Sequence, residues 1–224
     1  MIFATFNIHG FKKIEHNNGS HSLNLSPLLA DLKHRNIDVM AIQESHLQEA
    51  EYIQNEPGYT CYFVNDAGDI HHGTGIVIKE IFKPTFTKIS ARVCAATFTV
   101  DNNKHFLFIS GYAPHGKLSY ESPETRNNFY NDLNIALKLK KSNSFIILGL
   151  DANAKTFFDQ ELSPPNVLGH FTRGGVTNSN GEHLLEFSAT NDLFLTNTKF
   201  RHEFRERQIS ISFRQIDGEH WPQK

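Results

Sequence analysis

The sequence lacks several features that would place it in a specialised class of protein. Only two of its 224 residues are cysteines, Cys61 and Cys94, and neither has neighbours at metal-ligand spacing. This count excludes a disulfide framework, so we expect both thiols to pack in the core of a protein from a reducing compartment. No apolar run approaches the roughly 20 residues that span a bilayer. The N-terminus lacks the basic start and long apolar stretch of a signal peptide.

The chain also lacks a strong charge of either sign. It has 22 basic and 24 acidic residues and a formal net charge of -2, which argues against coating nucleic acid by bulk charge. One local exception is the segment 199–207, where four Lys or Arg residues alternate with aromatic residues. This segment could contact a phosphate backbone or form a solvated hairpin, and the sequence leaves both interpretations open. The 13 histidines are mostly scattered singly, so we expect solvated loop positions rather than a zinc site.

The length and composition favour a single domain covering residues 1–224. No repeat, low-complexity tract or linker divides the chain, and its hydrophobic content of 39% is ordinary for a globular protein. The 19 Phe residues favour a strand-rich core. Ser26 and Ser122 each precede a proline, which predicts helix N-caps at both serines. A third, short helix is expected after Asn180 and Gly181. Expected strands are 2–7, 37–42, 59–64, 75–79, 86–89, 93–100, 106–110, 145–150, 193–196 and 209–213.

The most informative stretch is the apolar run 145–150, which ends in Asp151 and Asn153. Residues two apart on an extended chain point the same way, so both side chains could face one cleft. A carboxylate there can accept a proton from water. The alternative is that Asp-Ala-Asn is only a turn, because Asp and Asn favour turns.

Polar residues also follow three other expected strands, at Asn7, Glu44 and Tyr112. Oxygen ligands without cysteine suit a hard cation such as Mg²⁺. One metal, a carboxylate base and neutral hydrogen-bond donors together fit the hydrolysis of a phosphate ester.

The order of these motifs resembles the endonuclease/exonuclease/phosphatase superfamily. The motifs are Thr-Phe-Asn-Ile-His-Gly at 5–10, Ile-Gln-Glu-Ser at 42–45, Gly-Tyr-Ala-Pro at 111–114 and Gly-Leu-Asp-Ala-Asn-Ala at 149–154. The segments 180–187 and 191–198 extend the likeness to the apurinic-endonuclease-like domain of non-LTR retrotransposons and to host proteins that resemble it. Each motif is weak alone, and the signal lies in their order across residues 5 to 198.

The resemblance implies an α/β fold, a four-layered sandwich of two packed, mostly antiparallel sheets flanked by helices. It also implies Mg²⁺-dependent DNA cleavage, with Mn²⁺ as an alternative ion. By matching position, Asn7 and Glu44 would hold the metal, Tyr112 would contact the phosphate, Asp151 would be the base, and Asn153 would orient phosphate or water. A nuclear or other intracellular location, a monomer without membrane contact, and a longer parent protein with a reverse transcriptase domain are implied in the same way.

Departures from the family pattern lead to further expectations. His9 stands where some relatives have an Asp near the metal. The family continues with a strand carrying Ile-Asp-Tyr and a later Ser-Asp-His segment whose His contacts the phosphate. Here the segment 212–221 resembles only the stretch before that strand, and His220 lacks the Ser-Asp-His context. We therefore expect a domain without its last strands and with impaired activity. Two alternatives stay open: an inactive relative that binds metal, phosphate or nucleic acid, and a hydrolase of phospholipid or inositol phosphate.

Overall fold

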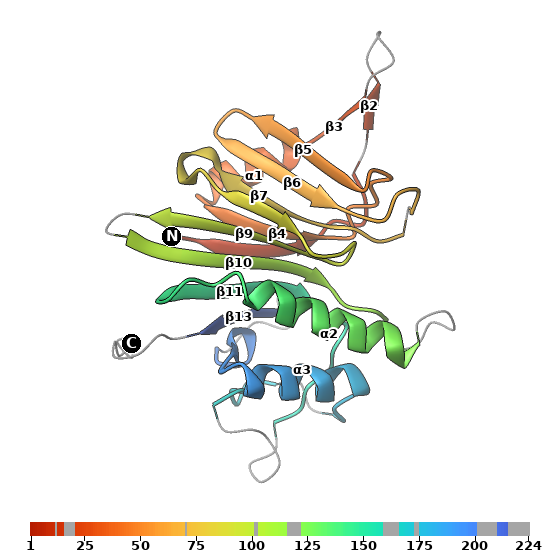
Figure 1. Ribbon diagram of the computed structural model, residues 1–224, viewed down its shortest axis with the longest axis vertical. Helices are drawn as coiled ribbons and strands as arrows, with labels where there is room; N and C mark the ends of the chain where they lie inside the picture. Colours follow the sequence, from red (N-terminus) through yellow and green to blue (C-terminus); the bar gives the residue numbers. More distant parts are fainter. Residues whose placement is uncertain are drawn as a thin grey trace.

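The structure is a computed structural model of the full chain. It describes residues 1–11, 13–15, 21–69, 71–100, 103–115, 122–158, 166–172 and 175–200, together with the backbone of 210–214. The expectations for 201–209, Asp217, Gly218 and His220 lie outside the described residues. Two sheets form the centre of the molecule, and helices lie on their outer sides (Figure 1).

The first sheet has five strands in the order β1-β4-β7-β6-β5. β1 and β4 run parallel, and every other neighbouring pair is antiparallel. The sequence predicted four of these strands but missed β5, whose two apolar or aromatic residues, Tyr52 and Ile53, are adjacent and so give no alternating apolar pattern. A separate hairpin of β2 and β3 was also missed. The strands are β1 (Phe3–Asn7), β2 (Lys13–Glu15), β3 (His21–Leu23), β4 (Val39–Gln43), β5 (Glu51–Glu56), β6 (Tyr59–Val64) and β7 (Thr74–Lys79).

The second sheet has six strands in the order β12-β13-β11-β10-β9-β8. Only β10 and β11 are parallel. The strand expected at 209–213 is confirmed as β13, which pairs with β11, whereas the strand expected at 193–196 shortens to β12 and continues as the 3₁₀ turn η3 (Thr196–Thr198). The strands are β8 (Thr85–Lys88), β9 (Val93–Val100), β10 (Lys104–Tyr112), β11 (Ser144–Asp151), β12 (Phe194–Leu195) and β13 (Ser210–Arg214), and the turn η1 (Glu80–Phe82) precedes β8.

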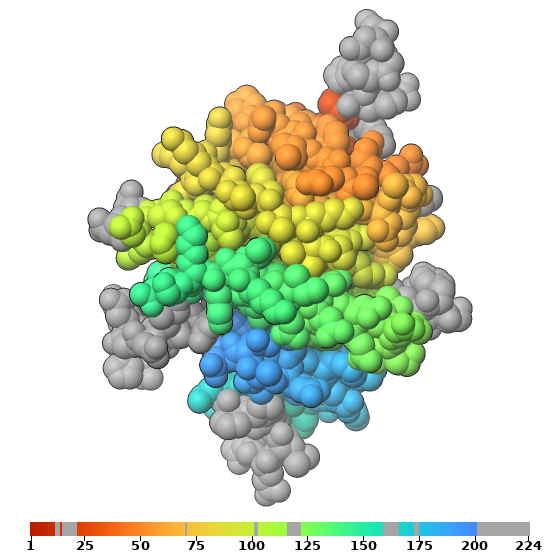
Figure 2. All heavy atoms as spheres, in the orientation of Figure 1, coloured from red at the N-terminus to blue at the C-terminus, as the bar shows by residue number. Residues whose placement is uncertain are grey.

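Three apolar layers hold the sheets and helices together. A middle layer between the sheets includes Val39 and Ala41 of β4 and Ile147 of β11. One outer layer packs the first sheet against α1 (Ser26–His34). The other packs the second sheet against α2 (Pro123–Leu137) and α3 (Ser179–Thr190), which lie side by side and cover this face in the space-filling view (Figure 2). The predicted four-layered α/β sandwich is confirmed.

Of the two serine N-caps predicted from the sequence, one is confirmed and one is wrong. Ser122 is the predicted N-cap of α2, and its hydroxyl accepts a hydrogen bond from the Thr125 N–H at 3.2 Å. The N-cap prediction for Ser26 is wrong, because Ser26 lies inside α1 and Leu25 precedes it without a side-chain cap. Pro27 does lie in the first turn of α1, where its missing N–H leaves no hydrogen bond unmade.

Two further features concern the cysteines and the lengths of the helices. Cys61 and Cys94 are free, buried thiols, as predicted. In the described part of the chain, no helix is both long and apolar enough to span a membrane.

Candidate active site

The site lies where two pairs of parallel strands end, one pair in each sheet. In the first sheet, Asn7 at the end of β1 is in register with Gln43, and Glu44 follows. In the second sheet, Tyr112 at the end of β10 is in register with Asp151 at the end of β11. Because the strands of each pair run parallel, both partners deliver their last side chains to the same edge. The sequence predicted all four of these strand ends.

The two sheets approach each other closely beside the site. Gln43 is buried in the gap and donates from Nε2 to the Gly149 carbonyl at 3.1 Å, while its Oε1 accepts from the Thr5 hydroxyl at 3.0 Å. The Thr74 and Ser110 hydroxyls, 2.6 Å apart, make a second link. A Cβ at Gly149 would lie 2.4 Å from the Ala41 Cβ, so this approach requires glycine. The polar links fix the edge of one sheet against the other.

Asn7 joins the carboxylates of the two sheets. Its Nδ2 donates to Glu44 Oε1 at 2.6 Å and to Asp151 Oδ2 at 2.9 Å, across 144 residues of sequence. Its Oδ1 accepts a hydrogen bond from the His9 N–H at 3.2 Å. The amide nitrogen therefore lies between two acceptors, while the amide oxygen faces the main chain of the following turn.

The Glu44 carboxylate is largely enclosed, with a side-chain exposure of 13%. Oε2 lies 2.9 Å from His9 Nδ1 and 3.5 Å from His46 Nε2. Burial by itself raises the pKa of Glu44, but hydrogen bonds from Asn7, Tyr112 and His9 outweigh it, so the net pKa is lowered. Glu44 is thus held as an anion. Its main chain is in the left-handed region (φ 53°), as are His9 and His46.

Tyr112 is buried at 3% exposure and presents its hydroxyl to the same carboxylate. The hydroxyl also lies 2.7 Å from His115 Nε2. Burial and then the hydrogen bond to Glu44 raise the pKa of Tyr112. The neutral phenol therefore persists beside the carboxylates. The Arg92 guanidinium lies 5.5 Å from the centre of the Tyr112 ring and donates to its carbonyl at 3.3 Å.

Asn153 has a different geometry from the one that strand alternation predicts. It adopts a left-handed conformation (φ 45°), and its Nδ2 donates to the Ala113 carbonyl at 2.8 Å. Its main-chain N–H, rather than its amide, contacts Asp151 Oδ1 at 3.3 Å. Alternation fails because the extended chain ends at Asp151. Asn153 therefore braces the two strand-end loops.

A buried residue of α3 strengthens the same brace. Asn180 donates from Nδ2 to the carbonyls of Pro114, Ala152 and Asn153 at 2.8, 3.4 and 3.2 Å. The sequence placed Asn180 before the helix, but it lies in the first turn, and Asn178 is the N-cap. The segment after Asp151 is thus anchored to a helix of the outer layer.

The structure therefore brings all five predicted residues to one edge of the sandwich. The sequence analysis placed His9 near the metal but missed His46 and His115, because each occurs singly in the sequence. The available signal was their position three residues after a strand end, at Gln43 and at Tyr112. Among the described residues, no group of three or more His, Cys, Asp or Glu side chains is arranged to hold a metal ion.

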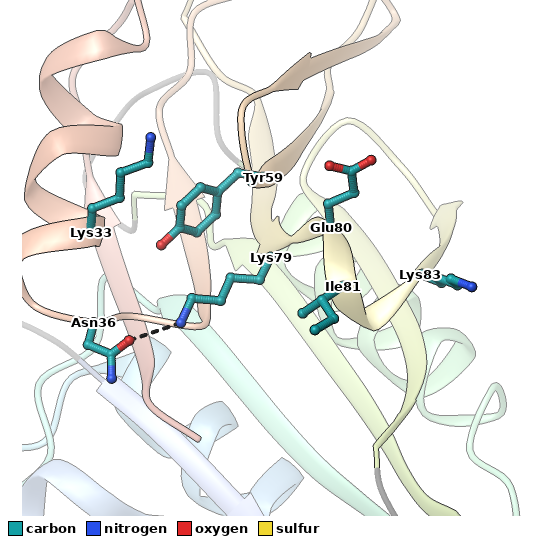
Figure 3. A pocket seen from close by; sticks show the side chains of 8 residues that line it. Lys33, Asn36, Tyr59, Lys79, Glu80, Ile81 and Lys83 are labelled. Carbon is teal, nitrogen blue, oxygen red and sulfur yellow. Dashed lines mark hydrogen bonds between the residues drawn. The ribbon is translucent and has the colours of Figure 1, made fainter.

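A surface pocket lies at the opposite end of the first sheet. It has a volume of about 590 Å³ and is lined by Lys33, Asn36, Gly58, Tyr59, Lys79, Glu80, Ile81 and Lys83. Figure 3 shows Lys79 turned toward Asn36, and its Nζ donates to the Asn36 Oδ1 at 3.0 Å and to the Asp38 Oδ1 at 2.6 Å. The register Val39↔Ile78 puts this pocket at the start of β4, whereas Glu44 follows its end. The pocket is separate from the candidate active site.

The fold and the site define a class of protein. The family model described as the endonuclease/exonuclease/phosphatase family matches residues 4–203. This chain belongs to that family, whose members are generally hydrolytic nucleases and phosphatases. No curated protein sequence gives a significant match.

Solved structures with a similar fold have low sequence identity. The endonuclease domain of TRAS1, a telomere-specific non-LTR retrotransposon, matches with a TM-score of 0.54 and 12% identity over 85% of this chain and 78% of that one. The 3′ phosphatase NExo from Neisseria, bound to product DNA hairpin, has a TM-score of 0.55 and 14% identity over 94% and 85%. An AP endonuclease from Archaeoglobus fulgidus has a TM-score of 0.54 and 16% identity over 95% and 86%. At these identities the likeness establishes the fold alone.

Proposed function

We propose that this chain is a metal-dependent phosphodiester hydrolase that acts as a DNA endonuclease of the retrotransposon type. The observation that carries the proposal is the Asn7 amide held between Glu44 and Asp151, at 2.6 and 2.9 Å. It unites an enclosed carboxylate from one sheet with a carboxylate from the other. The NExo phosphatase is bound to product DNA hairpin, and the TRAS1 domain and the Archaeoglobus protein are endonucleases, which supports DNA as the substrate.

The residues at the site fit a divalent cation. Enzymes of this family typically use one, and Mg²⁺ binds through one or two carboxylates while keeping several waters. Glu44 would hold the ion, because its lowered pKa keeps it anionic and its carboxylate oxygens are the kind of ligand that Mg²⁺ prefers. Asn7 would contribute its amide oxygen Oδ1, because the amide nitrogen cannot coordinate a cation and is bonded to both carboxylates. Mn²⁺ suits the same ligands. When bound, the ion would offset charge that develops on phosphoryl oxygens.

The other residues act on water and phosphate. Asp151 would orient and deprotonate the attacking water, since its carboxylate is partly exposed and lies next to Asn7. The Tyr112 hydroxyl would donate a hydrogen bond to a phosphoryl oxygen, and its raised pKa keeps it a donor. Asn153 would hold the loop that carries Asp151 and orient phosphate or water from its main chain and amide.

Nicking of supercoiled plasmid tests the proposal. The wild-type chain should nick in Mg²⁺ and not in EDTA, and Asp151→Asn should lose about 10²–10⁴-fold in rate, the usual contribution of a general base. Asp31→Asn is the matched control, because Asp31 is an exposed carboxylate on α1 with an i,i+4 ion pair to Arg35. A folded wild-type sample that does not nick would instead support a relative that binds metal, phosphate or nucleic acid without cutting.

A further inference from the structure

An Asp–His pair that neither the motifs nor the proposed mechanism uses lies beside the site. Asp69 Oδ2 and His72 Nδ1 are 2.5 Å apart, and Asp69 Oδ1 accepts from the His71 N–H at 2.7 Å. The two side chains are 25% and 19% exposed. Burial alone raises the pKa of Asp69, but the hydrogen bonds from His71 and His72 outweigh it and lower the pKa. In the described part of the chain, His72 Nε2 has no hydrogen-bond partner.

The loop that carries Asp69 is fixed to the body of the protein. Asn65 is fully buried and donates from Nδ2 to the carbonyls of Leu47 and Asp69, at 2.6 and 2.7 Å. The Gly68 N–H donates to the Gln48 carbonyl at 2.9 Å. These bonds hold the carboxylate in place, so that it can orient an imidazole without a loop rearrangement.

The segment that carries His72 lies directly against the chain that follows Glu44. The His46 N–H donates to the His72 carbonyl at 2.9 Å, and the Ser45 N–H donates to the Gly73 carbonyl at 3.3 Å. Gly73 has φ +98°, and a Cβ there would lie 2.3 Å from Ser45 Oγ. Only glycine allows this approach, which brings His72 to the candidate site.

The His72 ring completes a chain of contacts across the site. Its centroid lies 6.3 Å from that of Tyr112, whose hydroxyl bonds to Glu44. Glu44 contacts Asn7, and Asn7 contacts Asp151. In the first sheet, β1 with Asn7 and β7, which follows His72, lie on opposite sides of β4, and Asp151 bonds to Asn7. Asp151 and His72 therefore approach Glu44 from opposite sides. In phosphoryl transfer, the attacking and leaving oxygens lie roughly in line on opposite sides of phosphorus, so a base and an acid belong at opposite ends.

We propose that His72, oriented by Asp69, is a catalytic residue that contacts the substrate phosphate and donates a proton to the leaving oxygen. The inference rests on the proposed phosphodiester hydrolysis. It assigns the imidazole to the loop before β7, a place that none of the recognised motifs includes.

The proton balance of this step is complete. The water oxygen forms a bond to phosphorus, and its proton passes to the Asp151 carboxylate. The bond between phosphorus and the leaving oxygen breaks, and that oxygen takes the Nε2 proton of the His72 imidazolium. The neutral imidazole keeps its Nδ1 proton, which is hydrogen-bonded to Asp69. After product leaves, Asp151 releases its proton to solvent and solvent restores the Nε2 proton of His72.

Two substrates that differ in their leaving group test the assignment. His72→Ala should slow plasmid nicking by about 10²–10⁴-fold, the range of general acid catalysis. With bis(p-nitrophenyl) phosphate the same variant should lose less than about tenfold, because p-nitrophenolate leaves without a proton. Asp69→Asn should show the same split, since it removes the carboxylate that orients the imidazole ring. Equal losses on both substrates would mean that His72 is only structural, and unchanged nicking would reject it outright.

His71→Ala is the matched control, because His71 is an exposed neighbour that bonds to Asp69 through its main-chain N–H, which alanine keeps. It should nick like the wild type. Thermal unfolding measurements on His72→Ala and Asp69→Asn check that both variants are folded. If Asp69→Asn fails to fold, Asp69→Glu replaces it, and the leaving-group split remains the criterion.

Histidine ¹⁵N spectra separate this proposal from the proposed function. Inorganic phosphate, added without metal, should shift the His72 Nε2 resonance in a saturable way and leave His71 unchanged. A wild-type chain that never nicks but shows this shift would contradict the proposed hydrolysis while leaving the phosphate contact in place. A His72 resonance that ignores phosphate, in a chain that nicks, would overturn the assignment and leave the proposed function intact.

Discussion

The side-chain amide of Gln43 and the main-chain carbonyl of Gly149 meet across the two sheets at 3.1 Å. Gln43 directly precedes Glu44, and Gly149 lies two residues before Asp151. Gln43 is buried at 1% exposure, so the bond is shielded from water and its geometry is tightly held. The spacing of Glu44 and Asp151 therefore depends on how closely the sheets approach here.

Gly149→Ala tests that dependence. The new Cβ would meet the Ala41 Cβ at 2.4 Å and the Thr5 Cβ at 3.2 Å, so we expect a loss of about 1–3 kcal/mol in the free energy of unfolding, as is typical of overpacking. Urea denaturation measures it. Gly111→Ala is the control, because its Cβ would meet mainly Leu150 Cδ2, the end of a flexible side chain. An equal cost at both glycines would show that the sheet contact is not specially tight.

Tyr112→Phe tests the hydroxyl apart from the ring. The ring stays buried, but Glu44 and His115 lose their phenolic partner. We expect nicking to slow by about 10–100-fold, which is at or somewhat below the usual cost of losing one hydrogen-bond donor to the transition state. The midpoint of thermal unfolding should be nearly unchanged. Tyr59→Phe is matched in burial, also at 3%, and removes a hydroxyl bonded to the Ile37 carbonyl near the far pocket. That variant should keep full activity; a similar loss in both would point to a general packing effect.

Asn180→Ala should destabilise the protein by about 1–3 kcal/mol, because the buried carbonyls of Pro114 and Ala152 lose this donor and the Asn153 carbonyl keeps only Asn178. The loop that holds Asp151 in place would also lose its anchor to α3, so nicking should fall beyond what the loss of folded protein explains. Chemical denaturation and nicking on the same samples measure the two effects. Asn191→Ala, which removes a half-buried amide bonded to the Phe187 carbonyl, should be milder because water can replace the lost bond. Activity that tracks folded fraction alone would exclude the anchoring role.

Asp132 on α2 gives a pH-dependent prediction. Burial raises the pKa of Asp132, and the hydrogen bond from Ser90 offsets this only in part. A carboxyl whose folded pKa exceeds its unfolded value costs stability above the folded pKa and nothing below the unfolded pKa of 3.8. Asp132→Asn should therefore stabilise the protein at pH 7 by less than about 1 kcal/mol, because the group is partly solvated.

Urea unfolding between pH 3 and pH 7 measures this prediction, with the gain of Asp132→Asn shrinking as the pH falls. Asp31→Asn on α1 serves as the comparison, since its carboxylate is exposed and paired with Arg35. A gain for Asp132→Asn that stays constant with pH would mean that burial of the charge is not its cause.

The sequence specified the strand ends well because a buried strand leaves a clear apolar run and its last residue follows directly. Asn7, Glu44, Tyr112 and Asp151 all come from such runs, and the register of two parallel pairs brings them together. The order of the motifs indicated the four-layered sandwich, whereas the hydrophobic patterns alone indicated only a broad fold class.

Other features depend on contacts that no local pattern contains. Strand β5 has no alternating apolar pattern, so its pairing with β6 is a tertiary effect. Asn153 leaves the extended conformation, so its amide bonds to the Ala113 carbonyl, which strand alternation did not predict. His72 reaches the site only through the close approach of Gly73 to Ser45. A scattered histidine gives no hint of such an approach.

The hydrogen bond from Asn7 to Asp151 spans 144 residues and joins the two sheets. Neither sheet alone carries the whole candidate site: the first holds Asn7 and Glu44, and the second holds Tyr112 and Asp151. During synthesis, the N-terminal sheet emerges first, with only its own half of the candidate site. The proposed cleavage chemistry would arise only when the second sheet docks, so the topology would delay reactivity until the molecule is assembled.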